Sequence, residues 1–295
     1  MGLIYPYAEQ MNLYDLFDKT DHSPSAFLTR DKDFWGSGSA LTAEQRKGFA
    51  SVPYMVCPSR RSSPASYDAI SAFEDGPSAG PQTDYAIVCS TDASSYPSYR
   101  AARASADDVD QHYHVRVVYT DDDKYQKYQR GAFRGAVLPP GLNRYAAWKP
   151  RDSFARLRDG ATNQIFIGEK HIPVDALNVC NNAELNPNLY SDCHDCSYLE
   201  ARPTCGEGSV FRTVVQWWSE DGKVPGALIG KRIDGPFDNM ASGGLASINC
   251  GLGSWHLNGC NILMGDGSVR FFGNEIGYDV LAKLATVNDG NYVEF

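Results

Sequence analysis

The stretch HLNGCNILMGDGSVRF, residues 256–271, gives the clearest local structure signal in the chain. Asp266 and Gly267 separate two short, largely apolar runs at residues 261–265 and 268–272, and an Asp-Gly pair in that position is typical of a β-hairpin. A two-residue type I′ turn needs positive φ at both central residues, which Gly and Asp supply. We therefore predict a hairpin with a type I′ turn, in which Asn261 and Ser268 bond to nearby backbone.

The predicted elements on either side of this hairpin indicate a mixture of helices and strands. Apolar side chains at helical spacing predict a closing helix over residues 278–285, and Thr42 with Gln45 forms a capping box for a helix running to about residue 50. Tyr7, Met11 and Tyr14 fall with Phe17 on one face of a predicted helix. Strands are predicted at residues 83–90, 112–120, 164–168, 210–218 and 292–295.

Four blocks of the sequence resemble motifs of one family. Residues 256–271 closely resemble the C-terminal signature H-x-x-G-x-N-x-x-x-x-D-G-S-V-x-F of the DUF1559 family of pilin-like proteins. In the family's order, residues 3–14 resemble its L-x-P-Y-x-E-Q-x-x-L-Y block, residues 56–59 its C-P-S block, and residues 157–170 its D-G-x-S-N-T-x-x-x-G-E block. We assign structural roles to the motif residues His256, Gly259, Asn261, Asp266, Gly267, Ser268, Asp159, Gly160 and Asn163.

The resemblance implies one α+β domain over residues 1–295, a pilin-like head in which an N-terminal helix packs on an antiparallel β-sheet with long irregular insertions. Residues 1–20 would be the end of that helix, residues 171–208 a Cys-rich insertion loop, and residues 255–295 the C-terminal hairpin, helix and strand. Family members normally begin with a prepilin leader and an apolar helix of about 20 residues, long enough to span a bilayer. We expect both to precede Met1, which then looks like a truncated start.

The implied function is that of a non-enzymatic subunit of an extracytoplasmic filament, or of a machine like a type IV pilus or a type II secretion system. The expected location is the cell surface or periplasm, and the expected partners are other pilin-like subunits. Membrane contact would be made only through the preceding helix. No catalytic residue and no cofactor is implied.

Two other function classes stay open. Seventeen Tyr and five Trp residues could bind polysaccharide or another macromolecule on the cell surface or in the periplasm. A secreted hydrolase is the second alternative, but Ser254 and His256 lack the G-x-S-x-G pattern of a nucleophile elbow.

Composition excludes two broad classes of protein. The 295 residues include 27 Lys and Arg against 36 Asp and Glu, a net charge of -9, which argues against binding to nucleic acid. A hydrophobic fraction of 42% is enough for a folded core, so disorder is excluded as the main state.

Eight cysteines point to disulfides in an oxidising compartment, with Cys57–Cys89 and Cys250–Cys260 suggested by closeness in the chain. Cys193 and Cys196 form a C-x-x-C pair that could be redox-active, or could bind zinc with Cys180, Cys205, His194 or His171. Acidic runs at residues 107–110 and 121–123 are candidates for calcium, although neither has the pattern of an EF-hand loop.

Overall fold

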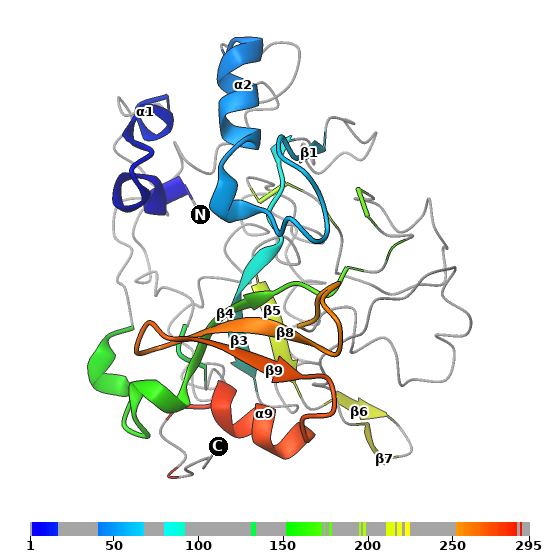
Figure 1. The fold of residues 1–295 in the computed structure, drawn as a ribbon. Coiled ribbons are helices and arrows are strands. Elements are labelled where there is room, and N and C mark those ends of the chain that lie inside the picture. Colours follow the sequence, from blue (N-terminus) through cyan, green and yellow to red (C-terminus); the bar gives the residue numbers. More distant parts are fainter. Residues whose placement is uncertain are drawn as a thin grey trace, which may run out of the picture.

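The computed structural model describes residues 2–16, 41–67, 80–91, 131–133, 152–172, 174, 177–178, 195, 197–198, 211–215, 217–219, 222–224, 252–287 and 290. Their elements form a central sheet with a helix along one side and a separate group of N-terminal elements (Figure 1). The fold is mixed α/β, as predicted at that level.

The central sheet contains five strands in the order β5-β3-β4-β8-β9. Their bounds are Tyr85–Thr91 for β3, Ile165–Glu169 for β4, Phe211–Val215 for β5, Gly259–Met264 for β8 and Val269–Gly273 for β9. The pairs β3–β4, β4–β8 and β8–β9 are antiparallel, but β3 and β5 are parallel. The sheet is therefore mixed, with one parallel pair at its edge, rather than wholly antiparallel as expected.

The predicted C-terminal hairpin is present as β8 and β9, but its turn is not type I′. Only Gly267 has positive φ, at 86°, and the Met264 N–H donates to the Ser268 carbonyl at 2.8 Å. The loop thus has three residues, the form in which a type I turn is followed by a left-handed glycine. Asp266 contributes its side chain instead, because Oδ1 accepts both the backbone N–H and the hydroxyl of Ser268.

The core of the sheet lies between its strands and the predicted C-terminal helix, α9 (Tyr278–Ala285). Alternate residues of β8 point inward, and Leu281 and Leu284 of the helix are fully buried against them. Every second side chain of the strand and the side chains three residues apart on the helix therefore face the same core. Helix α9 packs against β3, β4 and β5 (Figure 1).

The N-terminal segment differs from the predicted continuous helix. It consists of a 3₁₀ helix, η1 (Gly2–Ala8), and one α-helical turn, α1 (Met11–Tyr14), separated by Glu9 at a φ of 58°. The expected apolar face is not formed, because the side chains of Tyr7 and Met11 are 90% and 51% exposed while Tyr5 and Leu13 are buried.

The N-terminal segment also packs on a different partner from the one expected. Tyr5 and Leu13 lie in a second core with Phe49 and Ala50 of α2 (Ala43–Ala50). Helix α2 begins at the predicted capping box, in which the Thr42 and Gln45 side chains each accept the other's backbone N–H. In the described residues, the helix that lies along the sheet is therefore the C-terminal one.

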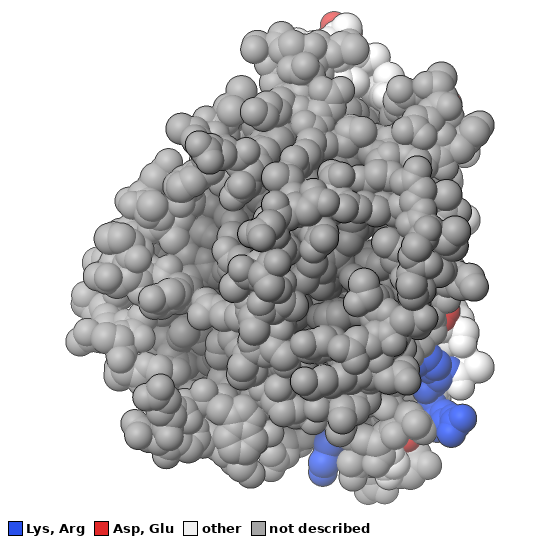
Figure 2. Space-filling model, turned by 180° about the vertical axis from the view of Figure 1, so that it is seen from behind, with Lys and Arg blue, Asp and Glu red and all other residues white. Residues whose placement is uncertain are grey.

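The remaining described elements are short. They are η3 (Pro53–Met55), β1 (Ser66–Tyr67), β2 (Gly80–Pro81), η5 (Phe154–Arg156), η6 (Ala161–Asn163), β6 (Trp217–Ser219) and β7 (Gly222–Val224). The predicted strands at 112–120 and 292–295 and both acidic runs lie outside the described residues. Among the helices that the structure does describe, none has the length and apolar character needed to cross a bilayer. From behind, a few described Lys and Arg side chains gather at one edge of the view (Figure 2).

Candidate functional site

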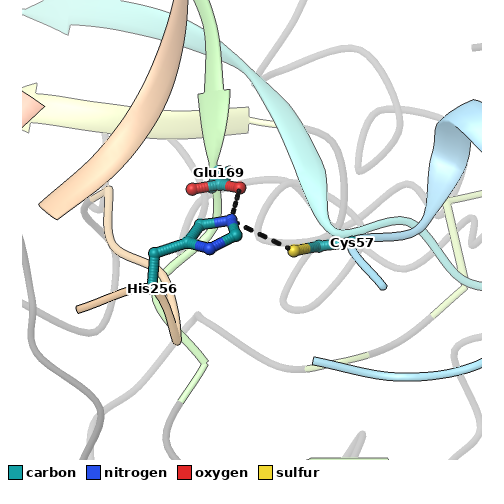
Figure 3. A group of neighbouring side chains, drawn as sticks. All are labelled: Cys57, Glu169 and His256. Carbon is teal, nitrogen blue, oxygen red and sulfur yellow. Dashed lines mark hydrogen bonds and ion pairs between the residues drawn. The ribbon is translucent and has the colours of Figure 1, made fainter. Parts of the chain in front are cut away.

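Three side chains from distant parts of the chain converge beside the sheet: Cys57, Glu169 and His256 (Figure 3). His256 Nε2 lies 3.0 Å from Glu169 Oε1 and 3.5 Å from Cys57 Sγ. All three ligand-type atoms are within 4.8 Å of one another, so this group could hold a metal ion. Cys57 and Glu169 are buried, and the His256 side chain is 30% exposed.

Cys57 is positioned by the loop that follows η3. Its backbone N–H donates to Asp84 Oδ2 at 2.7 Å, and Asp84 in turn pairs with Arg60 at 3.1 Å and with Arg61 at 2.7 Å. Two positive groups around one buried carboxylate compensate its charge, which is the condition for burying it. The loop is therefore fixed by a network that lies entirely inside the protein.

Arg60 also joins this loop to the two segments that supply the other site residues. One guanidinium nitrogen, Nη2, donates to the carbonyl of Lys170 at 2.5 Å and to that of Gly253 at 3.1 Å. Lys170 follows Glu169 directly, and Gly253 lies three residues before His256. One side chain thus holds all three segments at the site.

Glu169 is the last residue of β4, where the strand pairs with both β3 and β8. Its two carboxylate oxygens have different partners, because Oε2 accepts the backbone N–H of Asn261 at 3.0 Å while Oε1 faces His256. The sheet therefore fixes the direction in which this carboxylate points.

His256 lies in the turn that leads into β8. The Ser254 hydroxyl accepts the backbone N–H of His256 at 2.9 Å and donates to the carbonyl of Gly259 at 2.6 Å. Ser254 thus shapes the turn and does not contact the imidazole as a nucleophile would. The other ring nitrogen, Nδ1, faces the hydroxyl of Ser59 at 3.4 Å.

The geometry differs from that of a cysteine hydrolase. A catalytic relay uses opposite ring nitrogens of His for the nucleophile and for the orienting carboxylate. Here the thiol and the carboxylate both approach Nε2. Burial also raises the pKa of the Cys57 thiol, whereas a nucleophilic cysteine needs a lowered pKa.

Cys57 and Cys260 are free thiols in this structure, and the disulfides suggested for them are therefore wrong. The Cys57 sulfur faces His256, and the Cys260 side chain is fully buried in the core of the sheet. Burial strongly raises the pKa of the Cys260 thiol. Among the other predicted cysteines, Cys89 lies in β3 with its side chain undescribed, and Cys180, Cys193, Cys196, Cys205 and Cys250 are outside the described residues, as is His194.

The other motif residues lie at tight points of the backbone. Gly160 has a φ of 93°, the Asn163 side chain donates to the carbonyl of Asp159, and Asp159 Oδ1 accepts the Gly290 N–H. A Cβ on Gly259 would lie 2.1 Å from the Phe272 carbonyl oxygen. Each of these contacts fixes the backbone locally.

Local patterns in the sequence do not predict this group as a site. They suggest a disulfide for Cys57 and a structural role for His256, and they indicate no role for Glu169. A signal was nevertheless present, because the C-P-S block, the G-E block and the H-x-x-G block each contribute one ligand-type side chain. The predicted zinc candidate His171 is buried outside this group.

Comparison with known proteins identifies a family. No curated protein and no solved structure matches the chain. The family described as a protein of unknown function, DUF1559, matches over residues 1–278. With nearly the whole chain covered and with the four motif blocks in order, this protein belongs to the DUF1559 family.

Proposed function

We propose that this chain is the head of a pilin-like or pseudopilin-like subunit of an extracytoplasmic filament, or of a machine like a type II secretion system or a type IV pilus. The observation that carries the proposal is family membership over residues 1–278, since the resemblance to this family implies a pilin-like protein. In this role the protein acts through contacts with other subunits rather than through catalysis.

Exposed apolar side chains near the N-terminal segment support the proposal. Tyr7 is 90% exposed and Met11 is 51% exposed, and both belong to the segment that the resemblance places at the end of the assembly helix. Tyr54 is 41% exposed, and its hydroxyl donates to the carbonyl of Ala8 at 3.5 Å. Large aromatic and Met side chains in such positions are typical of surfaces that become buried on association.

Site-specific photocrosslinking in the native host tests this role. A photoreactive phenylalanine analogue at Tyr7 should give a ladder of crosslinked subunits in a sheared surface or periplasmic fraction. Phe154 is the matched control position, because it is also an aromatic residue and is 72% exposed, but it lies in η5.

The two positions separate specific contact from random collision. A ladder from Tyr7 with little product from Phe154 supports a subunit contact at the N-terminal segment. A protein found only in the cytoplasmic fraction, with no crosslinked multimers from Tyr7, would overturn the proposal.

A further inference from the structure

We propose that Cys57, Glu169 and His256 bind a zinc ion that joins three separate segments of the fold. The ligand atoms would be Cys57 Sγ, Glu169 Oε1 and His256 Nε2, with water in the fourth position. This inference does not depend on the proposed filament role, because the site could bind zinc whatever the function of the protein.

The two distances from His256 Nε2 to the other ligand atoms suit a tetrahedral ion. Zinc bonds of about 2.3 Å to sulfur and about 2.0 Å to nitrogen place those two atoms roughly 3.5 Å apart at a tetrahedral angle. The Cys57 Sγ to His256 Nε2 distance is 3.5 Å. The distance of 3.0 Å between Nε2 and Glu169 Oε1 needs to open by only about 0.3 Å to reach the corresponding tetrahedral separation.

A metal ion would engage all three side chains at once. The Nε2 atom of His256 carries either one proton or one lone pair, yet both the Cys57 sulfur and a Glu169 oxygen approach it. A cation placed between the three atoms accepts a lone pair from each of them. A thiolate and a carboxylate together also neutralise the two positive charges of zinc, which suits ligands as buried as Cys57 and Glu169.

Hydrogen-bonding groups around the three side chains are placed to orient them as metal ligands. Ser59 Oγ lies 3.4 Å from His256 Nδ1 and can accept a hydrogen bond from a proton there, and in that tautomer the lone pair of Nε2 is directed into the site. The backbone N–H of Asn261 occupies Glu169 Oε2 and leaves Oε1 for the ion. Arg60 contacts the carbonyls of Lys170, next to Glu169, and of Gly253, in the segment of His256. It also pairs with Asp84, which accepts the Cys57 N–H.

The ligand set selects the kind of metal. Calcium and magnesium prefer oxygen ligands throughout, and only one of these three ligands is oxygen. Thiolate, imidazole and carboxylate together are a ligand set that zinc accepts at tetrahedral geometry. The C-x-x-C pair of Cys193 and Cys196 lies outside the described residues, so the two candidate zinc sites must be separated by substitution.

The test is a zinc titration of the full-length chain, kept reduced with a phosphine and competed with a chromophoric chelator. Wild-type protein should bind zinc. Cys57→Ser and His256→Gln should each lower the affinity for one zinc equivalent by at least about 100-fold, which exceeds the usual effect of removing a residue that only hydrogen-bonds to a metal ligand. With cobalt in place of zinc, the thiolate-to-metal charge-transfer band should be lost in Cys57→Ser.

Two control variants separate this site from other thiols. Cys260→Ala removes the other free thiol of the described residues, and a Cys193→Ser/Cys196→Ser double variant removes the C-x-x-C pair. Both controls should still bind, with wild-type affinity, the zinc equivalent that the Cys57 and His256 variants weaken. If Cys57→Ser does not fold, Glu169→Gln replaces it with a change of nearly equal shape. Unchanged affinity in the ligand variants, or loss only in the double variant, would overturn the proposal.

Discussion

Arg61 and Asp195 form a buried bidentate ion pair. Arg61 Nη1 lies 2.8 Å from Asp195 Oδ2, and Nη2 lies 2.9 Å from Oδ1. Asp195 belongs to the segment predicted as a Cys-rich insertion, and Arg61 follows Cys57 by four residues. The Gln82 side chain also donates to the Asp195 carbonyl at 2.6 Å. The insertion is therefore tied to the loop that carries one residue of the site.

Replacing Asp195 with Asn should lower the free energy of unfolding by about 3 kcal/mol, the low end for breaking a buried ion pair. The low end applies because Arg61 keeps a second partner, Asp84, at 2.7 Å. Denaturant unfolding followed by circular dichroism measures the change. The matched control is Asp152→Asn, which removes a partly exposed i,i+4 pair with Arg156 and should cost at most about 0.5 kcal/mol. Equal costs for the two variants would contradict this account.

Acid should weaken the fold through the same pair. Despite complete burial, the Arg61 charge holds the pKa of the Asp195 carboxyl below its ordinary value. The stabilisation is complete above the unfolded pKa of about 3.9 and is lost as pH falls from there toward the lower folded pKa. Unfolding measured against pH should show a smaller loss below pH 4 in Asp195→Asn than in the wild-type protein. If the free energy of unfolding fell equally below pH 4 in both proteins, Asp195 would not be a cause of the acid sensitivity.

Alkali should weaken the fold through tyrosines that are buried or partly buried. Burial raises the pKa of Tyr85 to about 12, and it also raises the pKa values of Tyr5 and Tyr198, whose hydroxyls are hydrogen-bonded to each other. The unfolded chain releases these protons at pH about 10, so the free energy of unfolding is unaffected below that pH and falls above it. Tyr85→Phe should reduce the steepness of this fall between pH 10 and 12. Phenolate absorbance and denaturant unfolding measure this effect. An unchanged slope of unfolding free energy against pH in Tyr85→Phe would contradict the prediction.

Elements with a complete local signal were predictable from the sequence. The capping box places the start of α2 at the observed residue, and the apolar spacing of Leu281 and Leu284 places α9. Asp266 and Gly267 predict the hairpin but not its turn, because Asp266 bonds to Ser268 instead of adopting positive φ. An Asp-Gly pair is compatible with both turns, and the register of the strands decides between them.

The N-terminal helix and the site depended on information that local patterns do not contain. The periodic spacing of Tyr7, Met11 and Tyr14 is real, but the positive φ at Glu9 divides the segment. At the site, Cys57 and His256 are 199 residues apart, and Glu169 is 87 residues from His256. Their meeting depends on the pairing of β4 with β8 and on Arg60, which no single motif reveals.

Gly259→Ala should disrupt the start of β8, next to the turn that carries His256. The added Cβ would lie 2.1 Å from the Phe272 carbonyl oxygen and 2.8 Å from the Phe271 ring, a clash with backbone that a rotamer change cannot relieve. We expect a loss of about 3 kcal/mol in the free energy of unfolding. Gly273 is the cross-strand partner of Gly259, and a Cβ there meets nothing closer than 3.7 Å. Gly273→Ala should therefore cost less than about 0.5 kcal/mol, and a reversed order would refute the clash.

Ser59→Ala should lower the zinc affinity of the proposed site by about 10-fold, the small end of the range for partners of metal ligands. The hydroxyl lies 3.4 Å from His256 Nδ1, and when zinc takes the lone pair of Nε2 the hydroxyl can accept a hydrogen bond from the proton that Nδ1 then carries. Ser268→Ala is the control, because it removes a hydroxyl that donates to Asp266 in the hairpin loop. Competition titration should give wild-type affinity for the control. An unchanged affinity in Ser59→Ala would mean that Glu169 and Cys57 alone orient the imidazole, and that the contact with Ser59 is incidental to metal binding.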